Sequence, residues 1–362
     1  MGKQAHGGNL VWAAALAGCS PSAILDFSAS ISPLGPPGSV LAAIESQLSN
    51  IQHYPDPNYS DLRNTLSHFH QLPSEWIMPG NGSAELLTLA GRDLAGLSTN
   101  LGATVLITPA FGDYYRALAA YDAKVLEFSL FSAESLSVLK FQLSAISAQT
   151  SGLLLNNPHN PTGRLFRREE ILPLLDKFAL VVVDEAFMDF LPPDEEQSLL
   201  GVVQDYPNLV ILRSLTKFYS LAGLRLGYAV ASPQRLQRWQ SWRDPWSVNC
   251  FATAAGVAAI QDQEFQQQTW CWLPLARQQL FDGLAKIPGL TPWKSAANFL
   301  LVESEHACEY LQEQLLKKYK ILIRDCHSFP ELGDRFFRVA VRTTSENQLL
   351  LTALQGVVEN QE

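Results

Sequence analysis

Short apolar runs alternate with segments of helical pattern through the middle of the chain, and this alternation limits the fold more than any other feature. Runs such as Leu180–Val183 are wholly apolar, which is typical of strands buried on both faces. Strands of this kind, separated by helices, form parallel sheets covered on both sides. We therefore predict an α/β fold with a mostly parallel central sheet sandwiched by helices. The strands are expected at Thr104–Thr108, Ser151–Leu155, Leu180–Val183, Leu209–Arg213 and Gly227–Ala231, and the helices at Ala84–Gly96, Tyr114–Ala120 and Arg168–Lys177.

The pattern changes on either side of this region, which predicts three parts. The first 38 residues are rich in Gly, Ser and Pro and indicate an extended arm with at most one short helix, Leu10–Ala17. After residue 245, a long helical region, Phe251–Ala285, precedes three runs of strand pattern. We expect an arm (1–38), a large domain (39–245) and a smaller α+β C-terminal domain (246–362). The C-terminal strands are expected at Phe299–Glu303, Ile321–Arg324 and Phe336–Val341.

Composition limits the class of protein. The chain has 362 residues, 47% of them hydrophobic and 17% charged, with a formal net charge of −9. This acidic balance argues against nucleic acid and anionic membranes as partners, and no apolar run approaches the roughly 20 residues of a membrane span. The five cysteines form no Cys-x-x-Cys pair and lie at no metal spacing with histidine. We expect free thiols, a cytoplasmic location and no metal.

A lysine and an aspartate each follow a predicted core strand, and together they indicate one cofactor. Asp184 directly follows Val181–Val183, and Lys217 lies in the turn after Leu209–Arg213. The carboxyl ends of parallel strands meet at one edge of a sheet, where ligands bind. A partly desolvated lysine can form a Schiff base with an aldehyde, and an aspartate can hold the proton of a pyridinium nitrogen. The two residues predict a site for pyridoxal 5′-phosphate (PLP).

Further segments supply what the rest of that cofactor needs. The turn Gly80–Glu85 opens an apolar helix, whose first amides suit a phosphate. Phe111 follows a strand and can stack on a planar ring, while the two Asn-Pro steps of Asn156–Gly163 make a rigid loop that can present an amide donor. Each has a plainer alternative: a chain reversal, a core aromatic or a tight turn. Asp184 alone could form a structural ion pair, and Lys217 alone could be a surface lysine.

The segments taken together resemble fold-type I PLP enzymes of the class I/II aminotransferase superfamily. Within it the chain is similar to the histidinol-phosphate aminotransferase branch, and more so to the threonine-phosphate decarboxylase branch. The resemblance is carried by Ala5–Asn9, Asp26–Ala29, Pro33–Gly35, Tyr54–Asp56, Arg213–Tyr219, Pro245–Asn249 and Phe337–Arg342.

The resemblance implies a role for each candidate residue toward the cofactor. Lys217 would form the Schiff base, and Asp184 would pair with the pyridine nitrogen. Asn160 would contact the 3-oxygen, and Phe111 would stack on the ring. The cofactor phosphate would be held by Gly82, Ser83, Ser214, Thr216 and Arg225.

The resemblance also implies contacts to a second subunit and to substrate. Tyr54 would reach the cofactor phosphate of the neighbouring subunit, so a homodimer is expected. Arg338 would bind the substrate carboxylate, and Arg324 and His6 are the candidates for a substrate phosphate. The small phosphorylated amino acid expected is O-phospho-L-threonine, decarboxylated to (R)-1-amino-2-propanol O-phosphate for cobalamin synthesis.

Residue types alone do not separate decarboxylation from transamination. Both reactions break a bond at Cα that is held perpendicular to the ring, so orientation decides between them. Phe187 stands where the aminotransferases usually carry Tyr, and it favours the decarboxylase. Ser30–Pro33 replaces the Asn-x-Asn-Pro of the related arm. The alternatives are a histidinol-phosphate or related PLP aminotransferase, and a PLP-fold binding module without turnover.

Overall fold

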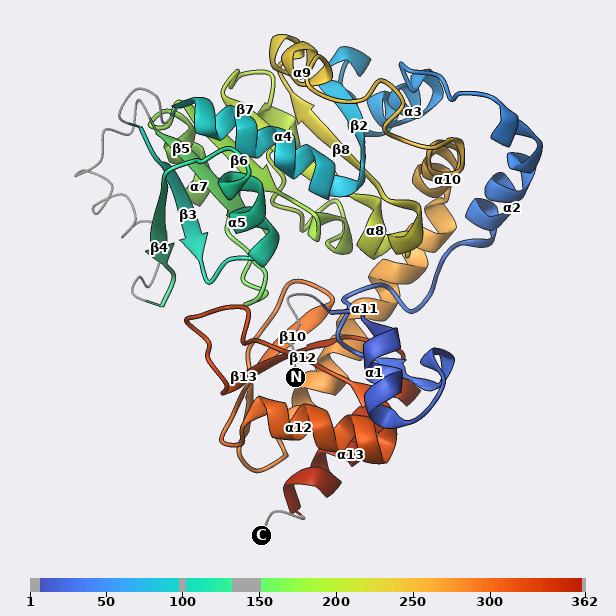
Figure 1. The fold of residues 1–362 in the computed structure, drawn as a ribbon, viewed down its shortest axis with the longest axis vertical. Helices are drawn as coiled ribbons and strands as arrows, with labels where there is room; N and C mark the ends of the chain where they lie inside the picture. The colour runs from blue at the N-terminus through green and yellow to red at the C-terminus, as the bar shows by residue number, and fades with distance from the viewer. Residues whose placement is uncertain (1–6, 98–101, 132–150, 360–362) are drawn as a thin grey trace.

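A computed structural model describes residues 7–97, 102–131 and 151–359. Figure 1 shows two lobes, an upper one built around a large sheet and a lower one that carries the C-terminal helices. Among these described residues, no helix combines the length and apolar character needed to cross a membrane.

The large sheet confirms the predicted α/β architecture. Its seven strands lie in the order β2-β8-β7-β6-β5-β3-β4. Strands β4, β3, β5, β6 and β7 pair in parallel, and β8 runs antiparallel to both β7 and β2. The bounds are β2 (Ile77–Asn81), β3 (Thr104–Thr108), β4 (Val125–Ser129), β5 (Gly152–Asn156), β6 (Leu180–Asp184), β7 (Leu209–Ser214) and β8 (Leu226–Ala231).

Both faces of this sheet are buried, as its apolar runs predict. Val182 belongs to a core beneath α4 (Gly82–Leu97), α5 (Gly112–Ala119) and α9 (Pro233–Gln240), and Figure 1 shows α4 and α5 across that face. Its neighbours Val181 and Val183 point to the opposite face and join the larger core. That core takes in residues of α3 (Ser60–His70), α7 (Arg168–Leu175) and α10 (Cys250–Gln261), and α10 also packs against α2 (Gly38–Ser46).

The predicted helical region Phe251–Ala285 is two helices rather than one. It divides at Asp262 into α10 and α11 (Gln263–Leu284), because the Asp262 carboxylate accepts a hydrogen bond from the Phe265 N–H at 2.9 Å and so caps the second helix. Figure 1 shows α11 running from the upper lobe into the lower one.

The C-terminal lobe contains a four-stranded antiparallel sheet in the order β12-β13-β10-β9. The strand predicted at Ile321–Arg324 is divided, because its two halves pair with different partners: Ile321–Leu322 (β11) pairs with the arm, and Arg324–Asp325 (β12) pairs with β13. The other elements are β9 (Leu290–Pro292), β10 (Phe299–Ser304), α12 (Cys308–Gln314), β13 (Phe336–Ala340) and α13 (Thr344–Glu359).

The described part of the arm lies on this second lobe. Its longest helix is α1 (Leu10–Ala17), as predicted, which packs with Leu316 and Leu322, and a single 3-10 turn follows at Pro21–Ala23. The arm then adds β1 (Leu25–Asp26) in parallel to β11. The two sheets lie on opposite sides of the expected boundary at residue 245, and the division into three parts stays a prediction.

Candidate active site

A cavity of about 300 Å³ lies where the carboxyl ends of the parallel strands meet the second lobe. Strands β5, β6 and β7 end at Asn156, Asp184 and Ser214, and all three residues line the cavity. The register that pairs Asn156 with Asp184 explains why these ends coincide. Of the residues predicted from the sequence, the cavity brings together Ser83, Phe111, Asn160, Asp184, Ser214, Thr216, Lys217, Arg225, Arg324 and Arg338.

One end of the cavity is a cradle for a phosphate. Helix α4 begins at Gly82, so the first amides of the helix and Ser83 border the space. Gly82 has a φ of +73°, and a Cβ there would lie 2.5 Å from Arg225 Nη2, so only glycine allows the guanidinium this close. Gly82 thus shapes the cradle from beside the cavity. The hydroxyls of Ser214 and Thr216 add two further donors.

Lys217 lies in the short helix α8 (Leu215–Phe218), directly after β7. Ser214 caps this helix by accepting from the Thr216 N–H at 3.3 Å, and the Lys217 carbonyl accepts from the Ser32 N–H at 2.9 Å, which fixes the backbone. Within the described ranges, no hydrogen bond or ion pair engages the Lys217 Nζ. The pKa of this amine is lowered to about 8, chiefly by burial and then by the positive charges of Arg338 and Arg225. The negative charges of Asp26 and Asp184 raise the pKa, but by less.

Asp184 is held by a donor on each carboxylate oxygen. The Tyr114 hydroxyl donates to Oδ2 at 2.8 Å, and the Ala186 N–H donates to Oδ1 at 3.0 Å. Burial raises the pKa of Asp184, and these two hydrogen bonds oppose that rise. The carboxylate is therefore fixed in orientation before any ligand arrives.

The Asn-Pro loop is rigid, as its sequence predicts. Asn157 donates to the Phe166 carbonyl and accepts from the Phe166 N–H, both at 2.9 Å. Asn160 is buried, and its Oδ1 accepts a hydrogen bond from Arg338 Nη1. Nothing in the described part of the chain accepts from Asn160 Nδ2, which leaves that amide as a donor for a ligand.

Two buried arginines border the cavity from the second lobe. Arg324 and Arg338 are 5% and 9% exposed, and they are directly paired across β12 and β13. Arg324 donates to Ser328 Oγ at 2.7 Å and lies 3.8 Å from Asp325. Burial lowers the pKa of Arg338 to about 10, Arg324 adds to that effect, and Arg338 Nε has no partner among the residues placed in the structure. Such a pair favours an anionic ligand.

Two aromatic rings line the same space. Phe111 lies edge-on to Tyr114 at a centroid distance of 5.7 Å. Phe187 is 6% exposed and meets Phe299 edge-on at 5.1 Å, so the position has an apolar ring and no hydroxyl donor.

Besides Gly82, which lies beside the cavity, two other predicted residues are not placed among those that line it. Tyr54 is 79% exposed and stacks on Trp246 at 4.4 Å, so it does not line the cavity of its own chain. His6 lies outside the described residues, although Gly7 lines the cavity and the Gly8 N–H donates to Ser28 Oγ at 2.8 Å.

The sequence reasoning missed one residue that contacts the centre of the site. Tyr114 lines the cavity and binds Asp184. Phe111 precedes α5 as its N-cap, so Tyr114 lies one helical turn later, on the same side. The spacing of three residues between Phe111 and Tyr114 is the sequence signal that could have identified Tyr114 as a site residue. Ser28, Asp113 and Phe329 also line the cavity and were not predicted.

Comparisons with known proteins agree with this geometry. The profile of the family described as Aminotransferase class I and II matches residues 22–354. Over 360 residues, the chain is 39% identical to threonine-phosphate decarboxylase of Salmonella typhimurium, covering 98% of this chain and 96% of that one.

Two solved structures are similar along nearly the same length. Histidinol-phosphate aminotransferase from Clostridium acetobutylicum is 28% identical with a TM-score of 0.84, and L-threonine-O-3-phosphate decarboxylase from Porphyromonas gingivalis is 25% identical with a TM-score of 0.82. Each match covers 93% of this chain and 100% of the other. The chain therefore belongs to the aminotransferase class I and II family.

Proposed function

We propose that this chain is a PLP-dependent enzyme that decarboxylates O-phospho-L-threonine to (R)-1-amino-2-propanol O-phosphate and CO₂. The observation that carries the proposal is the pair of buried arginines, Arg324 and Arg338, at the cavity that also holds Lys217. The substrate has two anionic groups, a carboxylate and a phosphate, and each arginine can bind one of them. The identity of 39% to a threonine-phosphate decarboxylase supports the same substrate class. We place the reaction in cobalamin synthesis, which the relatives of this chain support.

The residues present fit PLP. The α4 amides, Ser214, Thr216 and Arg225 match a phosphate dianion, while Asp184 and the Nδ2 of Asn160 match the ring nitrogen and the 3-oxygen. When bound, PLP supplies an electron-accepting ring for the electrons released as a bond to Cα breaks. Lys217 Nζ supplies the amine for the covalent link.

The arginines decide which bond of the substrate is broken. Arg338 is fixed between Asn160 and Phe299, whose ring centroid lies 4.7 Å from the guanidinium carbon. Arg338 would bind the carboxylate and Arg324 the phosphate, so that the two contacts together would fix the orientation of the substrate about Cα. Lys217 Nζ would supply the proton that replaces CO₂ at Cα, and its pKa of about 8 keeps much of the amine protonated near neutral pH.

The test is direct. We expect purified protein with PLP and O-phosphothreonine to release CO₂. We also expect the bound cofactor to absorb at about 420 nm, and this absorbance should be lost in Lys217→Ala. No CO₂, with turnover of histidinol phosphate and 2-oxoglutarate instead, would show an aminotransferase. Cofactor binding without either reaction would show a binding module. Full activity in Lys217→Ala would overturn the assignment of the lysine.

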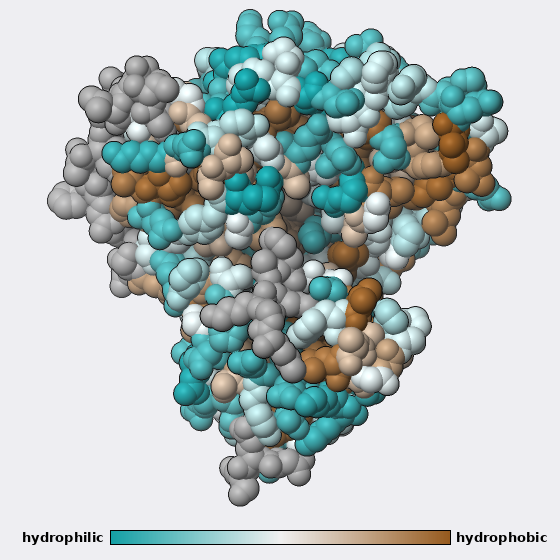
Figure 2. Space-filling model, in the orientation of Figure 1, coloured by the Kyte–Doolittle hydropathy of each residue, from teal (hydrophilic) through white to brown (hydrophobic). Residues whose placement is uncertain are grey.

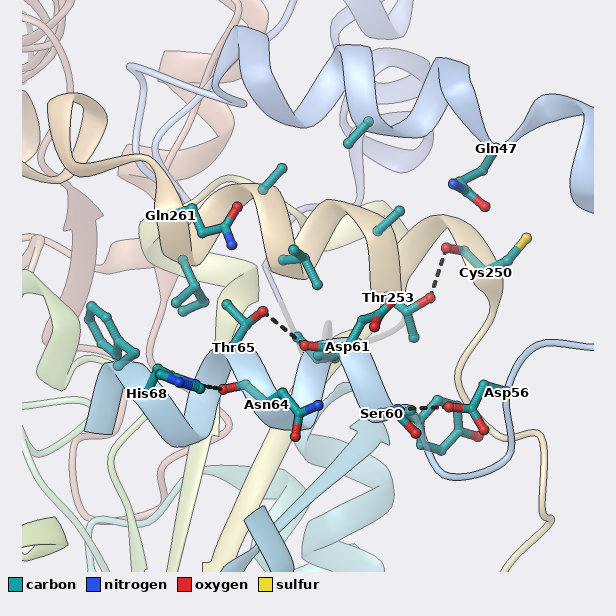
Figure 3. Close-up of a pocket in the computed structure, with 18 of the residues that line it drawn as sticks. Gln47, Asp56, Ser60, Asp61, Asn64, Thr65, His68, Cys250, Thr253 and Gln261 are labelled. Atoms are coloured by element: carbon teal, nitrogen blue, oxygen red, sulfur yellow. Dashed lines mark hydrogen bonds between the residues drawn. The ribbon is translucent and has the colours of Figure 1, made fainter. Parts of the chain in front are cut away.

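A homodimer is part of the proposal, because one face of the large lobe is unusually apolar. Large apolar side chains are exposed along residues 38–70, and Figure 2 shows apolar surface over α2. A groove of about 920 Å³ between α3 and α10 adjoins them, with His68, Asn64 and Thr253 at its walls (Figure 3). A second copy of the chain would cover this face. The exposed apolar side chains of this face are Leu41, Leu48, Ile51, Tyr54 and Phe69, and Trp246 stacks on Tyr54.

Subunit mixing tests whether Tyr54 acts across that interface. Lys217→Ala and Tyr54→Ala chains are unfolded, mixed and refolded together. If Tyr54 serves the neighbouring site, hybrid dimers contain one intact site, and activity returns. The control mixes Lys217→Ala with Asp184→Ala, which belong to the same chain's site and give no intact site. Failure of the first mixture to recover any activity would rule out the contact in trans.

The cytoplasm is the compartment we propose. All five cysteines are free thiols, and Cys308 and Cys326 are buried. Free thiols are typical of proteins kept in a reducing environment.

A further inference from the structure

We propose that Tyr114 is a positioning residue, which keeps Asp184 ionised and correctly turned toward the ring nitrogen of the bound cofactor. The inference rests on the proposed PLP site. It concerns this chain's own residues, because the contact between Tyr114 and Asp184 is present before any ligand binds.

The contact is well defined in geometry. Tyr114 is 2% exposed, and its ring is packed in the core between α4, α5 and the sheet. From there the hydroxyl reaches out of the core and donates to Asp184 Oδ2 at 2.8 Å. Because the Ala186 N–H occupies Oδ1, the two donors together set the plane of the carboxylate. A phenol has a single proton to donate, so the direction of this hydrogen bond is fixed as long as Asp184 is ionised.

The surrounding charges show why such a donor is needed. Burial raises the pKa of Asp184, and Asp113 on α5 raises it further. The opposing groups are Tyr114, the Ala186 amide and Lys217 on α8. The strand neighbours in register, Asn156 on β5 and Leu212 on β7, carry no charge. Among the residues that the structure describes, Lys217 is the cation that contributes most to the anion's stabilisation, besides its two hydrogen-bond donors.

The shared proton stays on the phenol. Burial and the nearby Asp184 raise the pKa of Tyr114 well above its ordinary value, so the hydroxyl is neutral whenever the carboxylate is charged. If the hydroxyl were absent, the pKa of Asp184 would rise, and the group would take up a proton at a higher pH. A protonated Asp184 lacks the negative charge that would stabilise a pyridinium nitrogen.

A purely structural role for Tyr114 is the rival explanation, and its neighbour on the helix provides a matched control. Tyr115 is also a tyrosine of α5, but its hydroxyl donates to Glu127 at 2.7 Å near the surface. The variants Tyr114→Phe and Tyr115→Phe each remove one hydroxyl and keep the ring.

The experiment measures PLP affinity of the full-length chain, freed of cofactor and titrated with PLP at pH 7.5 and pH 6. Loss of a hydrogen bond to a charged group predicts binding about tenfold weaker in Tyr114→Phe at pH 7.5. The ratio between variant and wild type should widen at pH 6, because the variant's Asp184 is protonated first. Titration of the PLP phosphate is common to both proteins and cancels in the ratio. Tyr115→Phe should match wild type at both pH values.

A double-mutant cycle keeps the inference testable if Tyr114→Phe is less stable. In an Asp184→Asn background there is no carboxylate to hold ionised, so adding Tyr114→Phe should cause no further loss of PLP affinity. An equal loss in both backgrounds, or an unchanged ratio between the two pH values, would show that the Tyr114 hydroxyl does not act through the charge of Asp184. Wild-type protein that fails to bind PLP would instead overturn the proposed function, and the two outcomes are therefore distinguishable.

Discussion

Arg324 and Arg338 are directly opposed on the antiparallel strands β12 and β13, so two buried cations border one cavity. Burial and the neighbouring positive charge both destabilise the charged form of Arg338, and its pKa is lowered for that reason. The carboxylate of Asp325, 3.8 Å from Arg324, offsets only part of the charge. The arrangement is therefore stabilised by a ligand with two negative groups.

Removal of either arginine should impair substrate use and leave the cofactor in place. Loss of one member of a buried ion pair costs about 2–5 kcal/mol, so kcat/KM for O-phosphothreonine should fall roughly 30-fold or more in Arg324→Met and Arg338→Met. Steady-state kinetics and cofactor absorbance check this. The control is Arg335→Met, whose side chain is 55% exposed and should leave kinetics unchanged. Unaltered kcat/KM in Arg324→Met would remove that residue from the substrate site.

In the cofactor-free protein, the pKa of the Lys217 amine should lie well below that of an ordinary lysine. Burial, Arg338 and Arg225 lower its pKa to about 8. Labelling by an amine-reactive reagent across pH, read by peptide mass spectrometry, should show a midpoint near that value. In Arg338→Met the midpoint should rise, because a nearby positive charge is gone. The profile of exposed Lys286 serves as the reference and should be the same in both proteins. A midpoint that stays in place would contradict the coupling.

The hydrogen bond from Thr108 to Glu331 joins the end of β3 to the loop between β12 and β13, close in sequence to Phe111 and Phe329, which line the cavity. Its length is 2.8 Å. A bond to a carboxylate contributes about 1.5–3 kcal/mol, so Thr108→Val and Glu331→Gln should each raise KM several-fold with little change in kcat. Because the two residues form one contact, the double variant should be no worse than the poorer single variant. Additive losses would show that the residues act independently.

Arg213 should be a major source of stability behind the site. Its side chain is 2% exposed and pairs with Glu185 at 3.0 Å and Asp189 at 2.5 Å. Arg213→Met would leave both carboxylates buried without a cation, which costs about 3–5 kcal/mol. Urea unfolding at pH 8 should show this loss. Lys317→Met, at an exposed pair, should change the free energy of unfolding by less than about 1 kcal/mol.

The deficit of Arg213→Met should shrink as the pH falls. Burial raises the pKa of Glu185 and Asp189 above their ordinary values. A carboxyl whose pKa is raised in the folded state contributes stability at low pH and loses it as the pH rises through the folded pKa. The variant should therefore be closer to wild type at pH 5 than at pH 8. A deficit that grows on acidification would contradict the sign of these shifts.

The central site was readable from the sequence because its residues follow strong local signals. Asp184 directly follows one apolar run and Lys217 lies in the turn after another, and parallel strands bring such ends together. Tyr114 was not predicted, since its role arises only when α5 docks against the sheet and its hydroxyl meets a residue 70 positions away. A tyrosine in an amphipathic helix otherwise indicates only a core position.

The elements that sequence reasoning missed have weak or conflicting patterns. Strand β2 contains Pro79 and Gly80, which argue against a strand, yet it lies at a sheet edge where a proline is tolerated. Strand β4 is the other edge and is only half-buried, so its apolar pattern is faint. The division of Ile321–Arg324 depends on which strand each half pairs with, a tertiary outcome that no local pattern encodes.

The pairing of Leu25 with Ile321 has a consequence for how the protein is made. Leu25 leaves the ribosome well before its partner Ile321 is synthesised. The large sheet uses only residues 77–231 and can assemble while translation continues. The contacts of α1 with Leu316 and Leu322 can form only after both of those residues have been synthesised. The described part of the arm therefore completes its packing later than the large sheet, although it is made earlier.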